Sequence, residues 1–106
     1  MKLNVIQYFK AFNPTDKKAH LKNEKNEDIV LKEILVSAVL GGSAEKLSGD
    51  EKLKRYRLAN RIFDSDNSVE MSAEELALTK AALGESNLPV VVLGQALEMI
   101  ENLGKN

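Results

Sequence analysis

Residues 63–76 carry oxygen-bearing side chains at a spacing that could bind calcium. A twelve-residue EF-hand loop directs ligands to the ion from its first, third, fifth, seventh and twelfth positions, among others. In a loop that begins at residue 64, those positions hold Asp64, Asp66, Ser68, Glu70 and Glu75. Calcium prefers oxygen ligands, and apolar residues flank the stretch as they do in such motifs. The spacing therefore indicates a degenerate calcium-binding helix-loop-helix as one alternative activity.

Several features of the same stretch argue against calcium. The sixth position, where the loop turns sharply and needs glycine, is Val69, and a β-branched residue is strained at positive φ. Ser68 brings no charge to the fifth position, and the sequence holds no second loop of this kind. Ser72 and Glu75 also form a capping-box pattern, which explains both residues without an ion. We therefore expect no calcium and no other cofactor, and keep calcium only as an alternative.

A second candidate is a basic stripe on the helix expected at residues 49–63. At about 100° per residue, Lys54, Arg57 and Arg61 fall within about 60° of one another, and such a stripe could follow nucleic-acid phosphates. The stripe is narrow, however, and lies between two apolar ridges that we expect to be buried, formed by Leu53, Tyr56, Leu58 and Ile62. Nucleic-acid binding is therefore a further alternative rather than the main expectation.

The charges are distributed unevenly along the chain. Residues 1–62 hold thirteen Lys and Arg against eight Asp and Glu, whereas residues 63–106 hold two against eight. Halves of opposite charge can neutralise each other when they fold together. We therefore expect the basic stripe to face either solvent or the acidic C-terminal half.

Composition excludes several kinds of chemistry. The chain has no cysteine, which excludes disulfides and thiolate sites, and its single histidine, His20, lies in a lysine-rich polar stretch. No glycine pattern of a phosphate-binding loop is present. We therefore expect that the protein is not an enzyme. The first residues lack the apolar core of a signal peptide, and no apolar run is long enough for a membrane span, which favours a cytoplasmic protein.

The N-terminal region, residues 1–30, is the part in which we expect β-structure. Residues 3–12 are rich in β-forming side chains, residues 13–16 have turn chemistry, and a polar stretch follows to residue 28. This order predicts a loose hairpin, or a strand with a long excursion. Three aromatic residues of the region are candidate anchors for a protein partner, although we expect at least two of them to pack in the core: Tyr8, Phe9 and Phe12.

Residues 31–104 are expected to form about four helices, which gives a small, mainly helical α+β domain over residues 1–106. Helical spacing covers residues 31–40, with Gly41 and Gly42 as the stop, and capping-box patterns at Ser48 and Ser72 begin the next two helices. Gly84 fits a left-handed C-cap. Residues 89–101 begin with β-branched side chains but keep helical spacing, so we interpret them as mainly helix, ending near residue 104.

The order of these segments resembles that of a group of small, uncharacterised proteins encoded by tailed bacteriophages and prophages. The likeness covers roughly residues 29–102 and rests on the pattern of residues 32–40, 51–62, 69–78 and 89–98. The resemblance implies no activity and no site. It implies a viral accessory or assembly protein that acts by binding another protein.

The sequence thus predicts a small non-enzymatic protein that binds a host protein, a viral protein or a second copy of itself. The expected contact surface is the exposed face of the C-terminal helix or the edge of the N-terminal strand.

Overall fold

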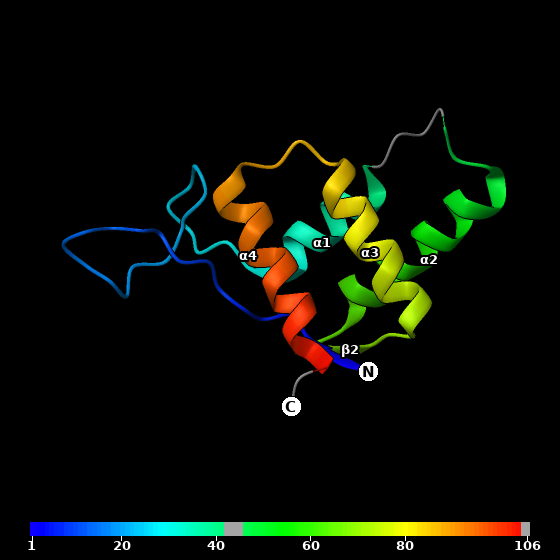
Figure 1. Ribbon diagram of the computed structural model, residues 1–106, viewed down its shortest axis with the longest axis horizontal. Helices are drawn as coiled ribbons and strands as arrows, with labels where there is room; N and C mark the ends of the chain where they lie inside the picture. Colours follow the sequence, from blue (N-terminus) through cyan, green and yellow to red (C-terminus); the bar gives the residue numbers. More distant parts are fainter. Residues whose placement is uncertain (42–45, 105–106) are drawn as a thin grey trace.

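The computed structural model of the protein describes residues 1–41 and 46–104, and within those ranges it contains four α-helices and one short two-stranded sheet (Figure 1). The helices are α1 (Leu31–Leu40), α2 (Gly49–Asp64), α3 (Ala73–Glu85) and α4 (Val90–Glu101), and a 3₁₀ turn, η2 (Asn102–Gly104), follows α4. The expected class, a small and mainly helical α+β domain, is confirmed. Residues 90–101 are helical, as their spacing predicted.

Local capping explains where two of the helices begin. At the start of α3 the Ser72 hydroxyl accepts from the Glu75 N–H at 3.1 Å, and the Glu75 carboxylate accepts from the Ser72 N–H at 3.0 Å. At the start of α2 only half of the predicted capping box forms: the Ser48 hydroxyl accepts from the Glu51 N–H at 3.2 Å, without a reciprocal bond from the Ser48 N–H to the Glu51 carboxylate. Each of these bonds satisfies an N–H that the helix itself leaves without a partner.

The prediction of a left-handed cap at Gly84 is wrong. Gly84 lies inside α3, which continues to Glu85, and no described glycine has a positive φ. The C-cap is instead Ser86, whose N–H donates to the carbonyl of Ala82 at 3.1 Å. A glycine in the last turn is therefore tolerated as an ordinary helical residue because the capping bond forms two residues later.

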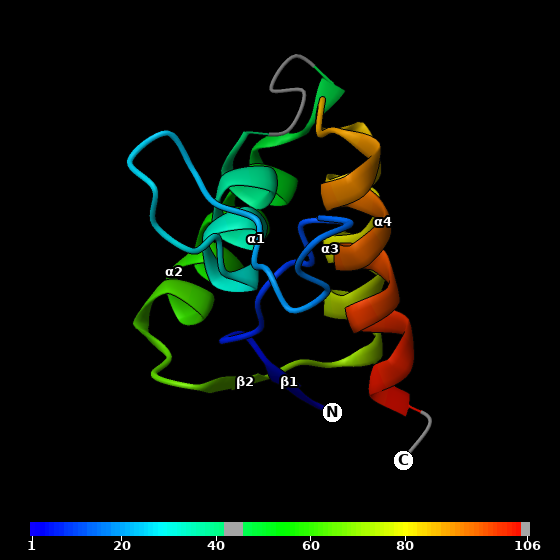
Figure 2. The same cartoon turned by 90° about the vertical axis from the view of Figure 1, so that its left-hand side faces the viewer.

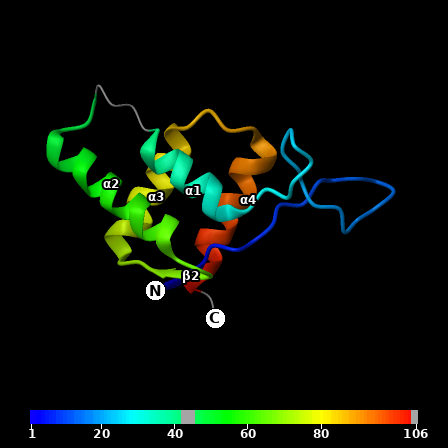
Figure 3. The same cartoon turned by 180° about the vertical axis from the view of Figure 1, so that it is seen from behind.

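The four helices pack as two pairs around one apolar core. α1 packs on α2 and α3, and α4 packs on α3, so that α1 and α2 lie on one side of the molecule and α3 and α4 on the other (Figure 2). Viewed from behind, α1 lies between α2 and α4 (Figure 3). Where α1, α2 and α3 meet, the contact is made by small side chains: Val39, Ala59 and Ala82.

The sheet joins the N-terminus to the segment between α2 and α3. β1 (Lys2–Asn4) pairs antiparallel with β2 (Ser68–Glu70), and Leu3 lies opposite Val69. Both of these central side chains are buried, whereas their neighbours face out, as the alternation of a half-buried strand requires. The N-terminal strand is confirmed, but its partner comes from the middle of the chain.

Residues 5–30 form an excursion between β1 and α1; its middle part extends away from the helices (Figure 1), whereas Val5 and Phe9 are buried in the core. Isolated bridges hold it together, among them Tyr8 to Val30 and Lys10 to His20. The His20 ring stacks on Tyr8 at 4.7 Å between centroids. Hydrogen bonds from Lys22 and His20 keep the pKa of the Asp28 carboxyl below its ordinary value. Of the two predicted forms, the structure shows a short strand followed by a long excursion, and isolated bridges close that excursion as a loose hairpin.

Candidate functional site

The three aromatic residues proposed as anchors have different positions in the structure. Phe9 is fully buried, so it belongs to the core and is not available at the surface. Tyr8 and Phe12 are 45% and 67% exposed. The expectation that at least two of the three would be core residues is therefore wrong, because the excursion turns both remaining rings outward.

Phe12 borders a groove of about 630 Å³ between the excursion and α4. Most of the lining is apolar, and it consists of Ala11, Phe12, Leu21, Val90, Val91, Gly94, Gln95 and Glu98. Val90 is 87% exposed, the largest exposed fraction among the large apolar side chains that the structure describes. The groove thus joins the N-terminal excursion to the outer face of the C-terminal helix, one of the two surfaces that the sequence suggested for partner binding. The other suggested surface, the edge of the N-terminal strand, is not part of the groove, because β1 covers Lys2–Asn4.

Gln95 fixes the position of the excursion on α4. Its amide oxygen accepts from the Lys10 N–H at 2.8 Å, and its amide nitrogen donates to the Lys10 carbonyl at 3.0 Å. The same nitrogen donates to the Val91 carbonyl at 3.0 Å, which orients the side chain along its own helix. Gln95 therefore pairs with the backbone of Lys10 as a neighbouring strand would, and this pairing forms one wall of the groove.

Phe12 has an unusual backbone conformation. Its φ is 53°, and Asn26 is the other non-glycine residue with a positive φ in the described ranges. A bulky residue in this region is an outlier, and such outliers concentrate where a side chain has to be presented in a particular direction. The Lys10 ammonium lies 4.9 Å from the centre of the Phe12 ring. The ring is thus held at the mouth of the groove rather than in the core.

The three residues of the basic stripe line a second groove, of about 410 Å³, between α2 and α3. Arg61 pairs with Glu75 and also donates to the Glu70 carbonyl, and Lys54 lies 3.7 Å from the Glu74 carboxylate. Among the described residues Arg57 has no carboxylate within salt-bridge distance. The stripe therefore faces the acidic half of the chain, and two of its three cations are already opposite carboxylates.

The pairing of Arg61 and Glu75 has an electrostatic consequence. Hydrogen bonds from the Arg61 guanidinium and then from the Ser72 N–H hold the pKa of the Glu75 carboxyl below its ordinary value. Glu74 and Glu75 also place negative charge on the wall opposite the stripe. A phosphate backbone would be repelled by that wall, so the geometry gives little support to nucleic-acid binding.

The prediction that both apolar ridges of α2 are buried is wrong for one of them. Leu58 and Ile62 are buried, with Arg55 and Ala59 on the same side. The other ridge faces outward, because α1 and α3 together cover only one side of the helix. Leu53 and Tyr56 of this ridge are 45% and 57% exposed. Phe63, which lies on the same side of α2 and is 65% exposed, extends the outward ridge.

The residues of the calcium-like stretch are distributed over three elements, α2, β2 and α3, and Glu75 is the one in α3. Asp64 is the last residue of α2, Asp66 follows in a bend, and Ser68 and Glu70 are in β2. Val69, at the decisive sixth position, is extended and buried in that strand, so the stretch does not turn as a calcium loop does. Over residues 1–41 and 46–104 no three acidic, histidine or cysteine side chains converge as metal ligands would. The calcium alternative gains no support from this geometry.

No protein-family model, curated protein or solved structure matches the chain. The resemblance to phage proteins therefore stays a prediction. None of the helices in the described parts of the chain is both long and apolar enough to cross a membrane.

Sequence reasoning missed the residues of α4 that complete the first groove. Val90, Gly94 and Glu98 follow one another at a spacing of four, which places them in one row of a helix, and all three are exposed. That spacing was a usable signal for an outer face. Gln95 gave no such signal, because its role depends on the backbone of Lys10, which is remote in the sequence.

Proposed function

We propose that the protein is a small non-enzymatic binding protein that holds an apolar segment of a partner protein in the groove between the excursion and α4. The observation that carries the proposal is Phe12, an exposed ring on a strained backbone at the edge of an apolar groove. Val90, on the opposite wall, offers a second exposed apolar group. Burial of two such side chains is the kind of contact that dominates protein interfaces.

The charge in the groove narrows the class of partner. Glu98 is the one charged side chain of the lining, and within the described residues it has no salt-bridge partner. A lysine or arginine next to the partner's apolar residues would pair with it. The proposed ligand is therefore a short apolar segment that carries one cationic residue, in a host or viral protein. An accessory role in a phage-infected cell, in the cytoplasm, agrees with the sequence resemblance.

A binding assay with three peptides tests this function. The first is a short fluorescein-labelled peptide with alternating leucines and one central arginine; the second carries glutamate in place of the arginine, and the third carries serines in place of the leucines. Fluorescence anisotropy should show binding of the first, weaker binding of the second and none of the third. Loss of one buried side chain costs about 1.5–3 kcal/mol, so Phe12→Ser and Val90→Ser should each weaken binding by roughly tenfold or more.

Leu40→Ser is the matched control, because Leu40 is 56% exposed and lies at the end of α1, outside the groove lining. Its affinity for the first peptide should equal that of the unmodified protein. Circular dichroism would verify that all three variants are folded. Equal binding of the leucine and serine peptides, or an affinity that neither Phe12→Ser nor Val90→Ser changes, would contradict the proposal.

A further inference from the structure

The outward ridge of α2 is an apolar helix face that no described part of the chain covers. At about 100° per residue, Leu53, Tyr56 and Phe63 fall within about 80° of one another. Single apolar side chains on a surface are ordinary, but a row of three on one face of a helix is typical of a face that packs against something. The buried side of α2 already packs on α1 and α3. The packing of the described helices therefore does not need this second face.

Positive charge borders this face on both sides. Lys52 and Arg57 are exposed and flank it on the helix surface, and the Lys32 ammonium of α1 lies 5.9 Å from the centre of the Phe63 ring. Among the described residues neither Lys52 nor Arg57 has a carboxylate within salt-bridge distance. Two exposed carboxylates of α2 also lie near this face, that of Asp64 beside Phe63 and that of Asp50 in the first turn. Among these described residues, the border therefore carries three cations against two carboxylates.

An apolar row between cations matches one kind of partner. Leu53 and Phe63 are ten residues apart, which is about 15 Å along a helix, or nearly three turns of a partner helix packed alongside. Such a partner would supply leucine-like side chains at intervals of three and four residues, with glutamates or aspartates on the flanks to meet Lys52 and Arg57. We propose that the outward face of α2 docks an acidic amphipathic helix of another protein.

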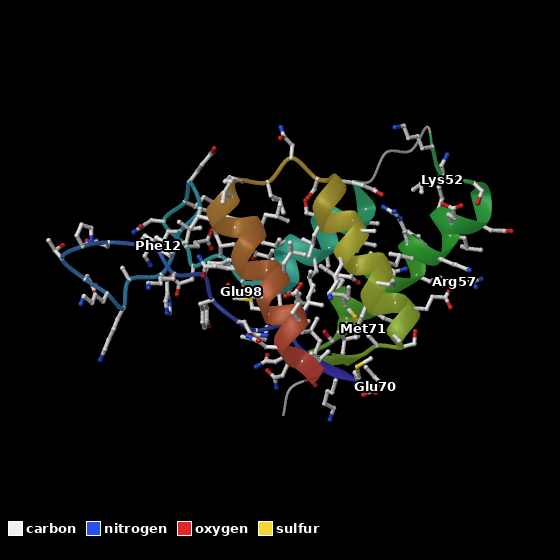
Figure 4. The ribbon with its side chains drawn as sticks, viewed as in Figure 1. Phe12, Lys52, Arg57, Glu70, Met71 and Glu98 are labelled. Carbon is white, nitrogen blue, oxygen red and sulfur yellow. The ribbon has the colours of Figure 1, made fainter. Side chains whose placement is uncertain are left out.

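The outward face of α2 and the groove beside α4 lie at different ends of the molecule. The molecule is 48 Å along its longest axis, and Phe12 lies toward one end of that axis whereas Lys52 and Arg57 lie toward the other (Figure 4). The α2 face and the groove beside α4 are thus far apart. The proposed partner of the α2 face is acidic, whereas the proposed partner of the groove carries a cation. A chain with two such sites can bring two different proteins together.

Two synthetic helices test the α2 face. The first is an amphipathic peptide with leucines at intervals of three and four residues and glutamates elsewhere; the second has the same leucines with lysines in place of the glutamates. Isothermal calorimetry should show binding of the acidic helix at least tenfold tighter than that of the basic one. The difference should shrink as salt is raised, because the flanking contacts are exposed to solvent.

Variants of α2 and of the groove separate the two proposed sites. Tyr56→Ser and Phe63→Ser should each weaken the acidic helix by tenfold or more, and Arg57→Glu should reduce its preference over the basic helix. Val90→Ser should weaken the peptide of the groove but not the acidic helix. Because the affected side chains are exposed, all four variants should melt near the unmodified protein.

Three results would overturn the proposal: equal affinity for the acidic and basic helices, an acidic-helix affinity that Tyr56→Ser and Phe63→Ser leave unchanged, or light scattering that shows a dimer lost on Tyr56→Ser. The last result would assign the face to a second copy of the chain. Failure of the groove peptide alone would contradict the proposed function and leave the α2 site standing.

Discussion

Replacement of Glu75 is the sharpest test of how the centre of this fold is held together. The carboxylate closes the capping box of α3 and pairs with Arg61 of α2, which also holds the Glu70 carbonyl in β2. Loss of the hydrogen bond between the Glu75 carboxylate and the Ser72 N–H costs about 0.5–1.5 kcal/mol, and a partly exposed ion pair contributes about 0.2–1 kcal/mol. We therefore expect Glu75→Ala to lower the free energy of unfolding by about 1–2 kcal/mol, which corresponds to a fall in Tm of roughly 5–15 °C.

Glu75→Gln divides this effect into its two causes. The amide oxygen still accepts from the Ser72 N–H, but the charge that attracts Arg61 is gone, so we expect a loss of about 0.5–1 kcal/mol. Glu74→Gln is the matched control, because it removes a charge from the same turn of α3 at a side chain that is 83% exposed and caps nothing. Urea denaturation followed by circular dichroism would measure all three variants.

The stabilisation by Glu75 should also depend on pH, in a direction that follows from its pKa. Because the pKa of Glu75 in the folded protein lies below its ordinary value of 4.5, the folded state binds fewer protons at this site than the unfolded state. The stabilisation is complete above that ordinary value and is lost as the pH falls through the folded pKa. The difference between the unmodified protein and Glu75→Gln should thus be constant near neutral pH and shrink in acid. A Glu75→Gln loss no larger than that of Glu74→Gln, or one that persists in acid, would refute the reasoning.

The same variants also test the calcium alternative. If Glu75 were a calcium ligand, millimolar calcium would raise the Tm of the unmodified protein and not that of Glu75→Gln. We expect calcium to change neither, because the carboxylate already accepts from the Ser72 N–H and pairs with Arg61.

Three further predictions concern the N-terminal part of the chain. Gln95→Ala should speed hydrogen exchange of the Lys10 amide by roughly tenfold, since a lost hydrogen bond costs about 0.5–1.5 kcal/mol, with little change in global Tm; unchanged exchange would contradict the role of Gln95. Leu3→Ala should cost about 2–5 kcal/mol in urea denaturation, because the side chain is fully buried and its removal leaves a cavity; a cost below that of surface variants would contradict it. Phe12→Gly should be at least as stable as the unmodified protein, since glycine relieves a positive φ that costs about 1–2 kcal/mol, yet it should lose the groove peptide in the anisotropy assay.

The features that the sequence predicted well depend on neighbouring residues. The capping box at Ser72 appears as expected, and α1 ends before Gly41 as expected, because each is decided within one helical turn. Gly42, the second residue of the predicted stop, lies outside the residues that the structure describes. The helical assignment of residues 90–101 was also correct, since the spacing of its apolar residues extends over three turns and outweighs a few β-branched side chains. Gly84 shows the limit of such local rules, because a glycine near a helix end does not have to be the cap.

The features that the sequence did not predict depend on which surfaces meet. α2 has two apolar ridges of similar strength, and only the packing of α1 and α3 decides that Leu58 and Ile62 are buried while Tyr56 and Phe63 remain outside. The pairing of β1 with β2 joins residues that are nearly seventy positions apart. The groove beside Phe12 likewise exists because Gln95 holds a remote backbone. No local pattern encodes any of these contacts.

Residues 64–75 carry the side chains that most resemble a binding site, but several of them already have a structural role. They are therefore not the best functional candidate. Two of the candidate ligands in residues 64–75 already have partners, because Glu70 pairs with the N-terminal ammonium and Glu75 closes the capping box of α3 and pairs with Arg61. Val69 pairs in a strand at the position where a calcium loop would turn. An ion would therefore have to displace the bonds of Glu70 and Glu75. Phe12, Val90 and the outward ridge of α2 are in the opposite situation. Exposure of these large apolar groups to water stabilises nothing within the chain, and Phe12 is held at a backbone conformation that favours glycine. Contact with another protein is the physical setting in which these features would lower the free energy.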